Sequence, residues 1–272
     1  MQQNINIPKR LARKYFGTGK KSDAELFCFA VWVKTQRENS VVFGMNHKQV
    51  RYRCKVGKKK AIRLLQDAAE DKELFTVEGE TIKVHSFRDK TAKTNRKKQE
   101  YFSDQCFKLK YRNDYTLREI YEILMEFLVL DPIVTHERKD CFTSSDSSDS
   151  TPSGAALPMT LKKVSENIGM SISTARRVIQ RLKTKGVITV ISAITFSCPI
   201  YYANEVAEVF RITGKREFTY IHHGIGYVVK QPCSYSIVNR EVLDKFQHVI
   251  YNYVPKSHSF KQVSTIPQLN DW

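Results

Sequence analysis

The feature of this sequence that most constrains its fold is an internal repeat, in which residues 46–76 align with residues 160–190 without a gap. Five of the 31 aligned positions are identical, which is weak support on its own. The register of apolar and polar positions, however, agrees throughout the alignment. Val50 falls on Val164 and Ala61 on Ala175, each at a position that helical periodicity turns inward. A repeat of this length in a chain of 272 residues predicts two tandem domains of one fold.

The second copy shows the underlying pattern most clearly. Helical spacing predicts a helix over 161–168 that ends at Gly169, followed by a second helix with Ser171 as its N-cap. Gly186 ends that helix, and the β-branched run 187–191 predicts a strand. The second helix turns inward Ile172, Ala175, Val178, Ile179 and Leu182. It turns outward Ser173, Thr174, Arg176, Arg177, Gln180, Arg181 and Lys183, a set of donors and acceptors suited to the DNA major groove.

This stretch resembles the winged-helix DNA-binding superfamily of bacterial and phage regulators. The residues that carry the resemblance are Leu161, Val164, Gly169, Ser171, Ser173-Thr174, Arg177, Leu182 and Gly186-Val187-Ile188. The resemblance implies a domain over 111–211, with a first helix at Leu117–Leu130 and a wing from Val187 through Phe196–Pro199 to a strand at Ile200–Ala203. It implies DNA contact by Ser171, Ser173, Thr174, Arg176, Arg177, Gln180 and Arg181. The wing tip departs from the family by lacking Arg, Lys and Gly, which puts a minor-groove contact there in question.

In the first copy, the domain is expected over 22–88, with its first helix at Asp23–Arg37 and a hairpin wing at Phe75–Val84. Its candidate DNA contacts are Lys48, Arg51, Lys58, Lys59, Lys60 and Arg63. Lysine presents a point charge, whereas the arginine fork reads guanine. The first copy is therefore expected to anchor phosphates and the second to read bases.

The charge distribution agrees with two contact surfaces. The chain has 45 Lys and Arg against 28 Asp and Glu, a net charge of +17, which favours a polyanionic partner. Residues 1–110 carry a net +14, residues 111–159 a net −5 and residues 160–272 a net +8. The acidic block ends in a Ser- and Asp-rich insertion at 140–158, which is expected to be disordered. A solvated loop, a phosphorylation target and a mimic of DNA are its open interpretations.

The remaining segments complete the predicted fold class, a mainly α protein with small β wings (α+β) and a small C-terminal extension. Residues 1–21 are expected to form a basic N-terminal arm or an entry segment, and 89–110 a basic linker or wing extension. Residues 212–254 are expected to form a small α+β extension, with paired strands at Glu217–Lys230 and a helix at Arg240–Tyr251. Residues 255–272 are expected to be a disordered tail.

Several function classes lack support in the sequence. No enzyme signature is present, so catalysis is not expected, and no cofactor is indicated. The six cysteines are far apart, which argues against a disulfide framework and a zinc site. Neither a signal peptide nor an apolar run long enough to cross a membrane is found, so a cytoplasmic location, in a bacterial cell or phage-infected host, is expected.

The sequence therefore predicts a double-stranded DNA-binding protein, sequence-specific and acting in transcription regulation. One alternative is a plasmid or phage replication initiator that binds origin repeats and contacts a replication protein, because the tandem layout is similar. Another is a protein-docking adaptor, because winged helices also serve in that role. The sequence does not indicate an oligomeric state.

Overall fold

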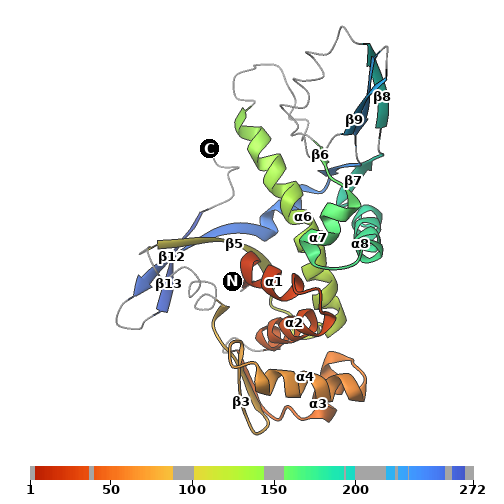
Figure 1. The fold of residues 1–272 in the computed structure, drawn as a ribbon. Coiled ribbons are helices and arrows are strands. Elements are labelled where there is room, and N and C mark those ends of the chain that lie inside the picture. Colours follow the sequence, from red (N-terminus) through yellow and green to blue (C-terminus); the bar gives the residue numbers. More distant parts are fainter. Residues whose placement is uncertain are drawn as a thin grey trace. The chain divides into compact units, whose positions relative to one another are not determined.

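The computed structural model describes residues 4–36, 40–87, 101–143, 156–192, 194–199, 219–223, 226–231, 233–254 and 259–266. This part of the chain is mixed α/β, with helices and small antiparallel sheets (Figure 1). It divides into two compact units. One comprises Met1–Leu128, Asn167–Met170 and Glu241–Trp272, and the other comprises Val129–Glu166 and Ser171–Arg240.

The first copy of the repeat lies within an alternating series of helices and strands. Its elements, in chain order, are α2 (Lys21–Gln36), β2 (Val41–Val42), α3 (His47–Cys54), α4 (Lys58–Glu70), β3 (Phe75–Glu78) and β4 (Thr81–Val84). The strands form an antiparallel sheet in the order β2-β4-β3. Gly79, at a φ of +57°, and Glu80 form the turn between β3 and β4, so the predicted hairpin over 75–84 is confirmed.

The second copy has the same order of elements. They are α6 (Leu117–Thr143), β6 (Leu157–Pro158), α7 (Leu161–Ile168), α8 (Ile172–Thr184), β7 (Ile188–Ile191) and β11 (Ser234–Ile237). Their sheet has the order β6-β11-β7, which matches β2-β4-β3 position for position. Met45 and Met159 each donate a backbone N–H to the residue that precedes the last strand, Glu80 and Cys233 respectively.

The predicted repeat is confirmed in its helices. α3 and α7 begin and end 114 positions apart, and so do α4 and α8. The buried positions coincide as well: Val50, Cys54, Ala61, Leu64 and Ala68 correspond to Val164, Ile168, Ala175, Val178 and Leu182. Identical periodicity has thus produced identical helix pairs, although few residues are shared.

The wing predicted after α8 is wrong in the part that the structure describes. β7 pairs with β11, and Phe196–Pro199 belongs to β8 (Ile194–Pro199), which pairs with β10 (Gly226–Gln231). β10 also pairs with β9 (Thr219–His223), which confirms the predicted paired strands near Gly226. The segment between β7 and β11 is therefore an insertion at the position of the two-residue turn in the first copy. Residues 200–203 lie outside the described residues.

A four-stranded antiparallel sheet joins distant parts of the chain in the order β1-β5-β12-β13. Its strands are β1 (Asn4–Pro8), β5 (Tyr101–Lys110), β12 (Phe246–Val254) and β13 (Ser259–Ile266). The predicted N-terminal arm, linker and tail therefore each contribute a strand where the structure describes them, and the prediction of a disordered tail is wrong over Ser259–Ile266. The helix predicted at Arg240–Tyr251 is wrong, because only a short 3-10 helix (Arg240–Lys245) precedes β12. The apolar residues of this segment fit both the helical period of 3.6 residues and the strand period of two. The segment forms a strand because it pairs with β5.

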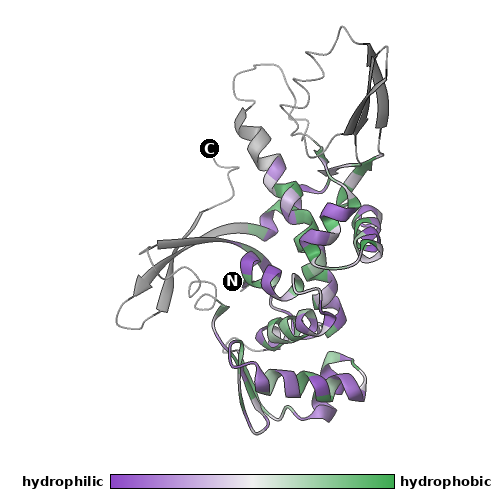
Figure 2. Cartoon of the chain, viewed as in Figure 1, coloured by the Kyte–Doolittle hydropathy of each residue, from purple (hydrophilic) through white to green (hydrophobic). Residues whose placement is uncertain are grey.

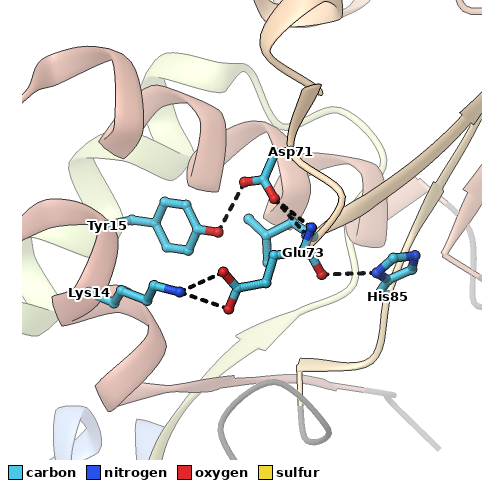
Figure 3. A network of polar contacts seen from close by, with 6 residues as sticks. Lys14, Tyr15, Asp71, Glu73 and His85 are labelled. Atoms are coloured by element: carbon cyan, nitrogen blue, oxygen red, sulfur yellow. Dashed lines mark hydrogen bonds and ion pairs between the residues drawn. The ribbon is translucent and has the colours of Figure 1, made fainter. Parts of the chain in front are cut away.

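The N-terminal segment is further fixed by α1 (Lys9–Phe16), whose Leu11, Ala12, Tyr15 and Phe16 are buried. Figure 3 shows the polar contacts between α1 and the turn after α4. The Tyr15 hydroxyl donates to Asp71 at 3.0 Å, and Lys14 Nζ lies 2.6 Å from a carboxylate oxygen of Glu73. Burial, followed by the nearby Asp71 charge, raises the pKa of Tyr15 well above its usual range, so the phenol stays protonated and donates. These contacts make α1 part of the folded unit rather than a free arm.

The prediction of a disordered Ser- and Asp-rich insertion over 140–158 is wrong at both ends. α6 continues to Thr143, past the predicted end of its helix at Leu130 and past Pro132, and β6 begins at Leu157. Residues 144–155 lie outside the described residues.

An aromatic cluster fills the space between the four-stranded sheet and the start of α6. The ring of Phe107 stacks on that of Phe127 at 4.9 Å, and Phe246 meets both rings edge-on, at 5.2 Å from Phe107 and 5.8 Å from Phe127. Phe246 has no exposed surface, so the first residue of β12 contributes to the core.

Truncating Phe246 should therefore be costly. We expect Phe246→Ala to lower the free energy of unfolding by about 3–5 kcal/mol, because a large buried side chain leaves a cavity. Tyr52→Ala, at a side chain that is 83% exposed, is the control and should change stability by no more than about 0.5 kcal/mol. Denaturant unfolding measures both. Equal stability of the two variants would contradict a core role for Phe246.

The turn between α3 and α4 offers a second test, because Lys55 has a positive φ of 53°. Gly169, 114 positions later, has a φ of 61° in the same turn of the second copy. A left-handed conformation is strained for any residue with a Cβ and relaxed for glycine. We expect Lys55→Gly to be about 0.5–1 kcal/mol more stable than Lys55→Ala, which removes the same charge and keeps the strain. Thermal unfolding of the pair measures this difference, and an alanine variant at least as stable would refute the strain argument.

Candidate nucleic-acid interface

The second copy presents a basic, polar face on α8. Arg176, Arg177 and Gln180 are exposed, and among the described contacts they have no hydrogen-bond or ion-pair partner. Lys183 is also exposed, while Arg181 is half-buried. The long side chains of three consecutive turns are thus available on a helix whose other side, at Ala175, Val178 and Leu182, is anchored in the core.

A cluster of hydroxyl groups lies at the start of α8. Ser171 caps the helix by accepting the backbone N–H of Thr174 at 3.3 Å. Its Oγ also lies 2.8 Å from Ser173 Oγ and 3.0 Å from Thr174 Oγ1. Ser171 therefore has a capping role, and Ser173 beside it is exposed as well.

One of the residues of α8 that were predicted to face the core does not do so. Ile172, the first residue of the helix, is 47% exposed, because it precedes the first full turn that packs on the core. Ile179 is buried as predicted.

In the first copy, the predicted cations fall into two groups. Lys48 and Arg51 on α3 and Lys58 and Lys59 at the start of α4 are exposed. Figure 2 shows that hydrophilic residues predominate along both of these helices. These four side chains remain candidates for contact with phosphate groups.

Lys60 and Arg63 are instead engaged in ion pairs with a buried carboxylate, while their side chains stay 34% and 43% exposed. Glu25 of α2 is 4% exposed, Lys60 Nζ donates to its Oε1 at 2.7 Å, and Arg63 donates to its Oε2. A buried carboxylate without a countercharge is strongly unfavourable, so both cations neutralise Glu25. Arg63 also lies 3.7 Å from Asp67 on its own helix. The structure thus gives Lys60 and Arg63 a structural role that their sequence positions did not reveal.

Arg53 of α3 likewise serves the fold. Its guanidinium lies 5.4 Å from the centre of the Trp32 ring and donates to Gln36 Oε1 at 2.9 Å. Trp32 in turn donates to the backbone oxygen of Tyr115 at 2.8 Å.

Two residues that the sequence analysis did not select lie on the exposed side of α3. Tyr52 is 83% exposed, and Lys55, in the turn that follows, is exposed as well. Their spacing from Lys48 and Arg51 would have identified them, because positions 48, 51, 52 and 55 share one face of a helix.

The buried cysteines of the first copy show no sign of reactivity. Burial raises the pKa of the Cys28 and Cys54 thiols, so both stay protonated and pack as small apolar groups. Within the described ranges, no group of three or more His, Cys, Asp or Glu side chains is arranged to hold a metal ion. None of the helices in that part of the chain has the length and apolar character needed to cross a membrane.

Comparison with known proteins found no matching family model, no similar curated protein and no similar solved structure.

The two groups of cations in the first copy should respond differently to substitution. Lys60→Met together with Arg63→Met leaves the Glu25 carboxylate buried with Lys21 as its remaining neighbour, 3.9 Å away. We expect this variant to lose about 2 kcal/mol of stability, and the further change Glu25→Leu to restore most of it. The matched control, Lys58→Met with Lys59→Met, should unfold like the natural protein. Similar unfolding curves for the two double variants would show that the Glu25 cluster has no structural role.

Proposed function

We propose that this chain is a double-stranded DNA-binding protein with two winged-helix domains, and that it acts as a sequence-specific transcription regulator. The proposal is supported by an order of elements that occurs twice: helix, short strand, two helices joined by a tight turn, and two further strands. That order is the one expected of a winged helix-turn-helix. In proteins with a helix-turn-helix, the second helix of the pair enters the major groove.

The observation that carries the proposal is the composition of the exposed face of α8. Arg176 and Arg177 can each offer two parallel donors to guanine, and Gln180 can pair in the same bidentate manner with adenine. Apolar burial on the opposite side holds these groups on a rigid helix. Rigid, outward arginine and glutamine side chains are the chemistry of base reading rather than of charge neutralisation alone.

A replication initiator is the second candidate, and the duplication favours it. Two domains of one topology in a single chain have a layout similar to plasmid and phage initiators, which bind iterated origin repeats. The two candidates share the same DNA-binding chemistry and differ in the target. A single preferred promoter site would indicate a regulator, whereas a cluster of direct repeats beside AT-rich DNA that melts on binding would indicate an initiator.

The proposal is tested with a pool of random duplexes of about 30 base pairs, long enough for two contacts a helical turn apart. The full chain should enrich a defined sequence through rounds of selection. Arg176→Ala with Arg177→Ala should weaken binding to that sequence by about tenfold or more and should relax the preference at one or two base pairs.

The control for this experiment is Lys72→Ala with Lys110→Ala, which removes two exposed cations outside the candidate interface. This control variant should bind the enriched sequence as tightly as the natural chain does. Failure of the natural chain to bind any duplex at low salt would reject DNA binding and would favour the protein-docking adaptor.

A further inference from the structure

The exposed face of α3 carries a basic and aromatic stripe, made of Lys48, Arg51, Tyr52 and Lys55. Lys48, Arg51 and Tyr52 lie on α3 at helical spacing, Lys55 follows directly as the left-handed C-cap of the helix, and all four are exposed. No acidic side chain interrupts the stripe. The opposite face of α3 is fixed in the core through Val50 and Cys54, so the stripe is presented on an anchored helix.

Tyr52 is the most exposed of the large apolar and aromatic side chains among the described residues, at 83%. A tyrosine this exposed gains little from packing, yet its ring and hydroxyl suit a surface that is partly apolar and partly charged. The sugar-phosphate backbone of DNA is such a surface, and tyrosine hydroxyls are among the groups that donate to its phosphate oxygens.

With glycine in place of Lys55, the protein is expected to be more stable. The left-handed backbone conformation of Lys55 is the one that Gly169 adopts in the second copy. Strained residues of this kind often cluster at functional sites, where the side chain has a role that glycine cannot take. The ammonium group of Lys55 extends the positive charge of the stripe beyond the end of α3.

The first copy could instead contact DNA by reading bases through α4, but the exposed face of that helix is poorly suited to base reading. Lys60 and Arg63 are engaged with Glu25, and the last turns of the helix carry Asp67 and Glu70. The corresponding part of α8 carries Arg181 and Lys183. Carboxylates at the end of α4 would repel phosphates on both sides of a groove.

We propose that the α3 stripe is the DNA contact of the first copy, in which Tyr52 and Lys55 donate to phosphate oxygens beside Lys48 and Arg51. The first copy then binds the duplex backbone without reading its sequence, and base reading belongs to α8. This inference rests on the proposed DNA-binding function. It adds two contact residues and removes Lys60 and Arg63 from the interface.

Lys55→Gly is the most informative variant, because stability and binding should change in opposite directions. The variant should unfold at a higher temperature than the natural protein, since the backbone strain is relieved. It should also bind a fluorescein-labelled, mixed-sequence duplex of about 30 base pairs more weakly, by about 3- to 10-fold. Weaker binding by a more stable protein cannot result from misfolding.

The salt dependence identifies the type of interaction that the stripe makes. Between about 50 and 200 mM KCl, the slope of log K against log salt should become less steep by about 0.9 for each phosphate group that the variant no longer neutralises. Tyr52→Ala should also weaken binding, and Lys72→Ala serves as the control that should not. Both stripe variants should weaken binding to all duplex sequences alike.

Three results would overturn the inference or its basis, and they are distinguishable. Natural affinity in both stripe variants, while Arg176→Ala with Arg177→Ala binds weakly, would reject the α3 contact and leave DNA binding intact. A changed sequence preference in Lys55→Gly would show that the first copy reads bases. No binding by the natural chain would reject the proposed function itself.

Discussion

The buried carboxylate of Glu25 determines how the first copy of the repeat uses its positive charge. α2 is buried on all sides from Ala24 to Thr35, so its one acidic side chain within that run requires countercharges from neighbouring helices. Lys60 and Arg63 supply them from α4. Two cations that were expected to contact phosphate groups from α4 therefore stabilise the fold instead. On the helix pair α3 and α4, exposed cations then remain on α3, at Lys55 in the turn between the helices and at the first residues of α4.

The two copies share a plan and differ in how it is elaborated. Both have paired helices of the same lengths, five matching buried positions and the same sheet order. A two-residue turn joins the last two strands in the first copy, whereas an insertion with its own three-stranded sheet occupies that position in the second. The shared part is what the core requires, and the parts that differ are the exposed helix faces and this connection.

Helical periodicity was sufficient to predict α3, α4, α7 and α8, because their apolar faces recur at fixed spacing. Strand partners were harder to predict: nothing near β7 in the sequence indicates β11, and nothing near β5 indicates β12. A strand's own residues specify a face to bury and not the segment that pairs with it. Charge counting likewise could not separate Lys60 from Lys58, since the difference depends on Glu25, which lies 35 positions away from Lys60.

Chemical acetylation of lysines, read by mass spectrometry with and without duplex DNA, tests the account most directly. The account predicts that the duplex protects Lys48, Lys55, Lys58 and Lys59 and leaves the exposed Lys72 reactive. Lys60, held by Glu25, should react slowly in both states and should not change when DNA is added. Protection of Lys60 with continued reactivity of Lys48 and Lys55 would contradict the account, because the first copy would then meet DNA through the face of α4.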